Sequence, residues 1–130
     1  MADRHAGAIL FSTRMDRLAA FYEAVTGLER TGGADDHHVL ESPGFTLVIH
    51  GIPEAIAASI SISDPPAVRI QSPTKLCLPV SDLGAARDRA GPLGGQVYGA
   101  ERTWTWGDVL VCDGHDPDGN VFQLWQTVSQ

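Results

Sequence analysis

The same order of predicted elements occurs twice along this chain of 130 residues. In each half, an apolar strand-like run precedes a segment with helical spacing, a glycine and three short strand-like runs separated by turn residues. A half of this size with an open sheet rarely buries enough apolar area to fold alone. The repeat therefore predicts a single domain, residues 1–130, made of two modules that pack together.

The first module is predicted over residues 6–50. Its helix is indicated by apolar residues at helical spacing, namely Met15, Leu18, Ala19, Tyr22 and Val25. Thr13 with Asp16 resembles a capping box at the start of this helix, and Gly27 marks its end. A strand is expected over residues 8–11, and three more over 28–31, 37–41 and 45–50. Gly32-Gly33 and residues 42–44 are the predicted turns between them.

The second module is predicted over residues 74–127. Asp82 is the expected cap of its helix, which Gly91-Pro92 ends. Strands are expected over residues 75–80, 96–100, 108–112 and 121–126, and the last follows a tight turn at residues 116–120. Each half is thus β-α-β-β-β, which predicts the α+β class with two tandem modules forming curved mixed sheets around a cleft.

The connector between the modules, residues 51–73, contains four prolines and a possible short helix at residues 54–58. Its isoleucines suggest that it packs on the body of the protein. Cys77 and Cys112 lie in apolar runs with no CxxC spacing, so both are expected to be buried free thiols.

The charge balance narrows the range of partners. Nine Lys and Arg against 16 Asp and Glu give a net charge of −7, which argues against nucleic acid or an anionic membrane surface as a partner. No uncharged stretch of the sequence is long enough to cross a bilayer. The expectation is a cytoplasmic protein with a small organic molecule as its ligand.

Several short motifs occur in the same order as in a known superfamily. They are Phe21-Tyr22 on the first helix, Gly27-Leu28 after it, residues 94–97 after the second helix and residues 116–120 before the last strand. Together they resemble the glyoxalase/bleomycin-resistance/ring-cleaving dioxygenase superfamily, also called the vicinal oxygen chelate fold. The resemblance covers about residues 6–50 and 74–127. It implies two βαβββ modules and a homodimer.

The resemblance also implies where a metal would be held. Metal-using members place one ligand near the start of the first strand and one on the last strand of each half, and these positions fall on Gly7, Val48, Lys75 and Gln123. Only Gln123 is a ligand type, and an ammonium at Lys75 would repel a cation. We therefore expect no metal cofactor. A displaced register leaves one alternative open, a divalent metal held by His5, His50 and Gln123.

Aromatic residues near the carboxyl end suggest a binding surface instead. Trp104 and Trp106 are two residues apart, and Trp125 shares a strand face with Gln123. Indole rings stack on flat molecules and bind cations through their faces. The predicted ligand-binding residues are Val48, His50, Lys75, Trp104, Trp106, Gln123 and Trp125, which together predict sequestration or drug resistance as the function.

Two enzymatic alternatives remain open at this stage. One is a metal-dependent lyase, isomerase or dioxygenase with an atypical ligand set. The other is a metal-free enzyme in which Lys75 or Glu101 acts as general base. The adjacent histidines His37 and His38 point to opposite faces of a strand, so they are not expected to bind one metal ion together.

Overall fold

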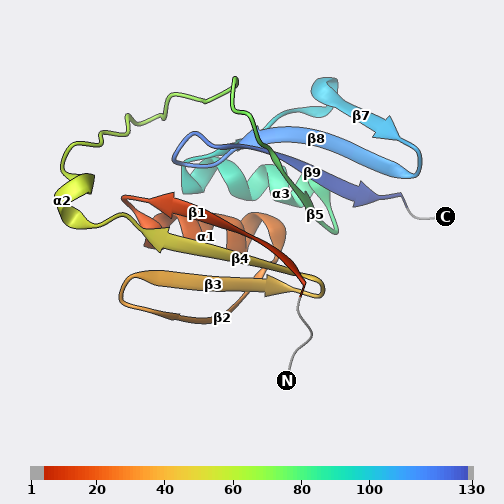
Figure 1. The fold of residues 1–130 in the computed structure, drawn as a ribbon. Helices are drawn as coiled ribbons and strands as arrows, with labels where there is room; N and C mark the ends of the chain where they lie inside the picture. Colours follow the sequence, from red (N-terminus) through yellow and green to blue (C-terminus); the bar gives the residue numbers. More distant parts are fainter. Residues whose placement is uncertain (1–4, 129–130) are drawn as a thin grey trace.

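The computed structural model describes residues 5–128, which form two mixed sheets (Figure 1). The first sheet has the order β1 (Ala6–Ser12), β4 (Phe45–Gly51), β3 (His37–Ser42) and β2 (Glu29–Ala34). The second has the order β5 (Leu76–Pro79), β9 (Val121–Thr127), β8 (Val109–His115) and β6 (Gln96–Val97), and β7 (Thr103–Trp106) also pairs with β8. In both sheets the first strand of the half runs parallel to the last. The predicted α+β class is confirmed.

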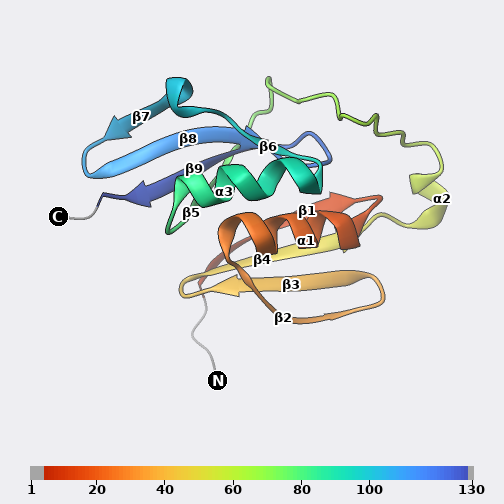
Figure 2. The same ribbon diagram turned by 180° about the vertical axis from the view of Figure 1, so that it is seen from behind.

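Two helices, α1 (Met15–Thr26) and α3 (Leu83–Ala90), pack against each other and lie on the same side of the two sheets (Figure 2). The core lies between these helices and the sheets, and its largest fully buried side chains include Tyr22, Phe21, Phe122, Leu18, Leu40, Leu47 and Leu124. Among the described residues, no helix combines the length and the apolar character needed to cross a membrane.

Three of the four predicted helix ends are confirmed, and α3 ends at Ala90, directly before Gly91-Pro92. Gly27 ends α1 in the left-handed conformation, at φ 76°, and the Asp82 side chain accepts a hydrogen bond from the Ala85 amide. The predicted Thr13 cap of α1 is wrong, because the cap position is Arg14 and no side chain caps it. Ser12 Oγ accepts a hydrogen bond from the Arg14 amide instead, at 2.9 Å.

The predicted turn at Gly32-Gly33 is also wrong. Both glycines lie inside β2, where the pairing with β3 contains a bulge, and the reversal of the chain falls on Asp35-Asp36. A bulge uses glycine in the same way as a turn does, so the sequence signal was ambiguous. In the second half, the predicted strand at residues 96–100 is interrupted by the short helix η2 (Ala100–Arg102), and the chain pairs again with β8 as β7.

The connector passes from β4 to β5 and includes the predicted short helix, α2 (Glu54–Ala57). The Arg69 amide donates to the Gly119 carbonyl at 2.9 Å, and Pro66 is buried, so part of the connector packs on the body. Ile56 and Ile70 remain 57% and 76% exposed. The prediction of a packed connector is therefore correct only for part of this segment.

The cysteine prediction is confirmed for Cys112 and wrong for Cys77. Cys112 is fully buried, whereas Cys77 is exposed. Leu76 and Leu78 are the residues of β5 that pack on the core, and side chains alternate along a strand. Cys77 therefore points to the opposite face of the second sheet.

A buried polar network joins the two halves. Tyr22 of α1 donates to Asp116 Oδ2 at 2.7 Å, and Ser12 at the end of β1 donates to Asp118 Oδ2 at 2.6 Å. Both carboxylates lie in the turn between β8 and β9, with residue exposures of 0% and 3%. Burial raises the pKa of Asp116, and burial together with the Asp116 charge raises the pKa of Tyr22 well above its ordinary value.

Candidate functional site

Each sheet has one face covered by the helices and one face that the helices leave uncovered, here called the open face. On β4, Leu47 and Ile49 are buried against the helices, while Val48 and His50 lie on the open face. On β9, Phe122 and Leu124 are buried, and Gln123 and Trp125 lie on the open face. Because side chains alternate along a strand, these four predicted binding residues lie on the uncovered faces of the two sheets.

The open face of the second sheet carries a chain of polar contacts. Lys75 Nζ donates to Asp113 Oδ2 at 2.9 Å, and Gln123 Nε2 donates to Asp113 Oδ1 at 3.1 Å. Trp125 Nε1 in turn donates to Gln123 Oε1 at 2.7 Å. The exposed thiol of Cys77 lies 3.9 Å from the same Gln123 oxygen. These contacts hold an ammonium, a carboxylate and an amide in fixed positions beside an indole ring.

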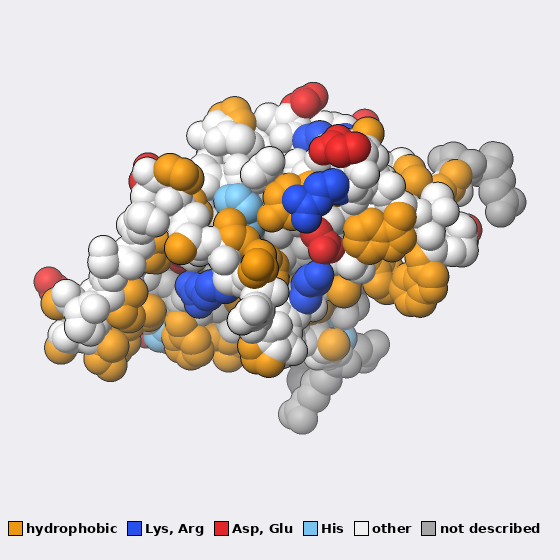
Figure 3. Space-filling model, turned by 90° about the horizontal axis from the view of Figure 1, so that it is seen from above, with side chains coloured by type: hydrophobic (Ala, Val, Ile, Leu, Met, Phe, Trp, Pro, Cys, Tyr) orange, Lys and Arg blue, Asp and Glu red, His pale blue; other side chains and the backbone are white. Residues whose placement is uncertain are grey.

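The three tryptophans form an aromatic surface next to these polar groups. Trp106 and Trp125 contact edge to face, with ring centroids 5.0 Å apart, and Trp104 lies on the same strand as Trp106. Trp104 and Trp106 remain 45% and 62% exposed. Val111, on the neighbouring strand β8, is buried. Figure 3 shows hydrophobic side chains gathered at this end of the molecule, with charged side chains of both signs beside them.

The open face of the first sheet has a different composition. His50 contacts Phe11, with ring centroids 5.6 Å apart, and stacks on His37 at 6.0 Å. Ile9 and Phe11 are 57% and 61% exposed. His37 Nδ1 lies 2.7 Å from Asp36 Oδ1, and this hydrogen bond lowers the pKa of Asp36.

The predicted ligand-binding residues thus form two clusters, one on each open face. Val48 and His50 belong to the first sheet, and Trp104, Trp106, Gln123 and Trp125 belong to the second, with Lys75 directly before it. Among residues 5–128, the aromatic contacts of His50 are to Phe11 and His37, and that of Trp125 is to Trp106. Each cluster is therefore held together by contacts within its own sheet.

The register of the two sheets shows that the halves are equivalent position by position. In the second sheet, Cys77 pairs with Gln123 and lies two residues after Lys75. In the first sheet, Ile9 pairs with Val48 and lies two residues after Gly7. Lys75 and Gln123 are thus the structural counterparts of Gly7 and Val48, as the resemblance implies.

The side chains at these four positions do not fit a bound metal ion. Gly7 and Val48 offer no donor atom, and Lys75 presents an ammonium group. The amide oxygen of Gln123 already accepts a hydrogen bond from Trp125. Within residues 5–128, no group of three or more His, Cys, Asp or Glu side chains is arranged to hold a metal ion.

The structure does not bring His5, His50 and Gln123 together. His5 Nε2 lies 2.7 Å from Thr46 Oγ1, near the start of β4, and His50 lies near its end. Four residues along a strand, from Thr46 to His50, span about 13 Å. Gln123 belongs to the other sheet. Of the two candidate bases, Lys75 contacts Asp113, while Glu101 is exposed in η2.

Asp113 is the site residue that the sequence analysis missed. The strand predicted over residues 108–112 ended one residue before it, whereas β8 continues to His115. Continuing the alternation of Val109 and Val111 by one more step would have placed Asp113 on the open face, opposite Gln123.

Two sheets built from tandem β-α-β-β-β halves define a protein of the vicinal oxygen chelate superfamily. A family model described as a glyoxalase-like domain matches residues 8–125. The chain therefore belongs to the glyoxalase-like family, and the resemblance found in its sequence is confirmed. No curated protein matches it.

Solved structures agree on the fold. One is a glyoxalase/bleomycin resistance protein/dioxygenase family enzyme from Burkholderia phytofirmans PsJN, with TM-score 0.65, 16% identity, and 94% of this chain and 97% of that chain covered. Another is the fosfomycin resistance protein FosX from Mesorhizobium loti, with TM-score 0.59 and 12% identity, and with 98% of this chain and 92% of that chain covered. A third is TioX from Micromonospora sp. ML1, with TM-score 0.61 and 17% identity, and with 97% of this chain and 100% of that chain covered. At these identities the likeness establishes the fold alone.

Proposed function

We propose that this glyoxalase-like protein binds a small organic molecule with a flat aromatic body on the open face of the second sheet, without a catalytic metal. The observation that carries this proposal is the exposed Trp104 and Trp106 beside the fixed Lys75–Asp113–Gln123 contacts. Binding sites for small molecules combine apolar and aromatic walls with a few convergent polar groups. Sequestration of such a molecule, as in drug resistance, is the function that fits.

The charges at this face favour a binding role for Lys75. Its ammonium lies against Asp113, so it is positioned to form hydrogen bonds with a ligand while its own charge is balanced. The donor set argues for metal-free binding, because two of the four family positions have no ligand atom and a third carries a cation.

The open faces also support the proposal of a homodimer. Ile9 and Phe11 on the first sheet and Trp104 and Trp106 on the second leave large apolar side chains uncovered. A second copy that faces its first sheet toward the second sheet of its partner would shelter Ile9 and the tryptophans in a cleft between the two subunits, and this cleft would still admit a ligand. Sedimentation velocity should then give a dimer, and Ile9→Asp should shift it toward the monomer.

Tryptophan fluorescence provides the direct test of ligand binding, because all three indoles belong to the proposed surface. Titration with metal-free bleomycin and with proflavine should quench the emission in a saturable way. Trp125→Phe should weaken binding about tenfold or more, because it removes the hydrogen bond to Gln123 and replaces the indole by a smaller ring. Phe45→Leu, on the first sheet, serves as the control and should bind normally.

Two outcomes would contradict the proposal. The first is that a broad set of flat aromatic compounds, these two included, leaves the emission of the folded protein unchanged. The second is stoichiometric metal in the purified protein, lost in Gln123→Ala, with binding abolished by chelator.

Lys75→Met should strengthen binding of the cation proflavine several-fold, because it leaves the Asp113 carboxylate unbalanced.

The contact between Lys75 and Asp113 also supports a second candidate, an enzyme that acts without a metal. Placing an ammonium and a carboxylate at 2.9 Å on an exposed face provides a proton donor and an acceptor for one substrate. Turnover insensitive to chelator and lost in Lys75→Met would favour this candidate over sequestration.

A further inference from the structure

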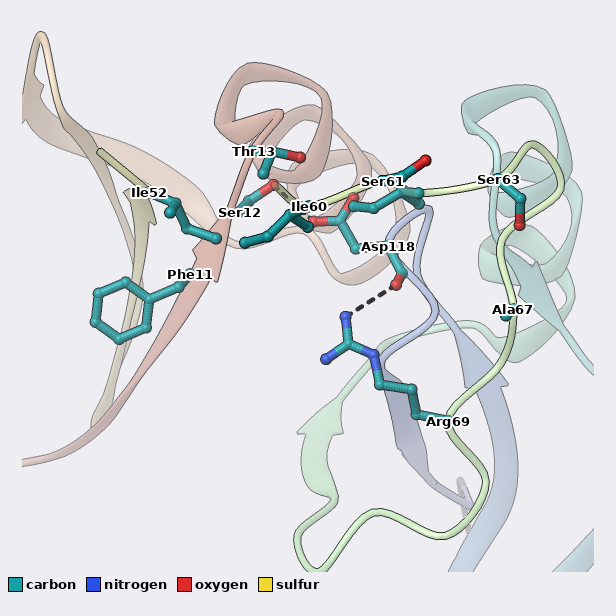
Figure 4. A pocket seen from close by; sticks show the side chains of 11 residues that line it. Phe11, Ser12, Thr13, Ile52, Ile60, Ser61, Ser63, Ala67, Arg69 and Asp118 are labelled. Carbon is teal, nitrogen blue, oxygen red and sulfur yellow. Dashed lines mark hydrogen bonds between the residues drawn. The ribbon is translucent and has the colours of Figure 1, made fainter. Parts of the chain in front are cut away.

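A cavity of about 610 Å³ lies away from the tryptophans, where the connector passes over the end of β1 and the turn between β8 and β9. It is here called the connector cavity. Figure 4 shows its lining side chains, which are Phe11, Ser12, Thr13, Ile52, Ile60, Ser61, Ile62, Ser63, Ala67, Arg69 and Asp118. Its volume is within the usual range for sites that hold small molecules.

One end of the connector cavity carries a cation without an ion-pair partner. Arg69 donates through Nη2 to the backbone carbonyl of Asp118 at 3.2 Å, and within residues 5–128 its guanidinium forms no ion pair. The Asp118 carboxylate accepts instead from Ser12 Oγ and from Arg14 Nη2. Figure 4 shows the guanidinium pointing toward the cavity, with donors left to bind an anion.

The other end of the connector cavity is apolar. Phe11 and Ile60 are 61% and 41% exposed, and the half-buried Ile52 and Ile62 line the same cavity. Ser61 and Ser63 add hydroxyl groups to the lining. A ligand that fits this arrangement has an apolar body and one anionic end.

We propose that the connector cavity binds a small organic acid, with its carboxylate on Arg69 and its apolar body against Phe11 and Ile60. A guanidinium recognises a carboxylate through two parallel hydrogen bonds. The net charge of −7 disfavours binding of organic anions over most of the surface. The positive charge of Arg69 favours their binding at the connector cavity. The site is separate from the tryptophan surface and does not depend on the function proposed for it.

The test uses 4-phenylbutyrate as the acid and 4-phenylbutyramide as its uncharged counterpart, followed by amide NMR of the whole chain. The acid should shift the amides of Ser12, Ser61 and Ser63 in a saturable way and leave the three indole N–H signals in place. Arg69→Gln should weaken binding of the acid about tenfold and leave binding of the uncharged amide unchanged. Arg69→Lys, which keeps the charge, should retain more of the affinity.

Two further variants separate the two ends of the site. Phe11→Ala should weaken the acid and the amide by the same factor, since it removes only apolar contact. Arg102→Gln is the matched control, because Arg102 is an exposed arginine that stacks on Tyr98. Equal binding of acid and amide by the unaltered protein, shifts confined to the indole signals, or no saturable shift at millimolar acid would each overturn the proposal.

Discussion

Tyr22 of the first half donates its hydroxyl proton to Asp116 of the second half at 2.7 Å, and both residues are buried. Asp116 also accepts from the backbone and side chain of Asn120 and from the amide of Asp118. This carboxylate therefore holds its own turn in shape and ties it to α1. The junction of the two modules depends on a polar contact as well as on apolar packing.

Tyr22→Phe should reduce the free energy of unfolding by about 1–2 kcal/mol, because it leaves a buried carboxylate with one hydrogen bond fewer. Urea unfolding measures the difference. Tyr98→Phe is the control, since within the described residues its hydroxyl has no hydrogen bond, and it should change stability by less than about 0.5 kcal/mol. Equal effects of the two substitutions would show that the Tyr22 contact contributes nothing.

Tyr22 should also make the folded protein less stable at alkaline pH. Its pKa in the folded protein is raised, by burial first and by Asp116 second, above the ordinary value of 10.0. Below about pH 10, the protonated Tyr22 contributes fully to the stability of the fold. Above about pH 10, Tyr22 loses its proton in the unfolded chain first, so the stability falls as the pH rises toward the pKa of Tyr22 in the folded protein. The loss approaches about 1.4 kcal/mol per pH unit. Urea unfolding above about pH 10 should show a steeper decline for the unaltered protein than for Tyr22→Phe.

Arg14→Met should destabilise the fold by about 2 kcal/mol. Arg14 donates to the Pro117 carbonyl and pairs with Asp118, whose side chain is 2% exposed, so its removal leaves a buried charge less well satisfied. Arg17→Met is the matched control, because Arg17 faces Asp64 at 3.7 Å and that carboxylate is 71% exposed. A loss of less than about 0.5 kcal/mol is expected there. Thermal unfolding that ranks the two variants the other way would contradict this account.

Substitution by alanine should affect stability very differently at two glycines. A Cβ at Gly114 would collide with the Gln96 carbonyl and the Phe122 ring, so Gly114→Ala should cost about 2 kcal/mol or more. Gly91 has helical backbone angles, φ −57° and ψ −52°, and open space around it, but Pro92 follows and disfavours these angles for a residue with a Cβ, so Gly91→Ala should change stability by less than about 1 kcal/mol. Calorimetry of both variants tests the pair, and a stabilised Gly114→Ala would exclude the close approach of β8 to Gln96 and Phe122.

The sequence predicted those features that depend on local pattern. The alternation in β4 and β9 correctly separates Leu47 and Leu124, which are buried, from Val48 and Gln123, which face outward. The cap at Asp82 and the stop at Gly27 are likewise local, since each depends on a few neighbouring residues.

Features that depend on distant partners escaped the sequence. Asp116 and Asp118 have the pattern of ordinary turn residues, and their burial follows from Tyr22 and Ser12, about a hundred positions earlier in the chain. The role of Arg69 at the connector cavity was equally hidden, because a charged residue in a proline-rich segment gives no periodic signal.

The outer edges of the two sheets are both interrupted. β2 carries a bulge and two glycines, and the outer strand beside β8 is split into the short pieces β6 and β7. Irregular, short edge strands are poor templates for hydrogen bonding to another chain. The interrupted edges therefore hinder copies of this protein from pairing edge to edge into a continuous sheet. Association of two copies is left to the faces of the sheets.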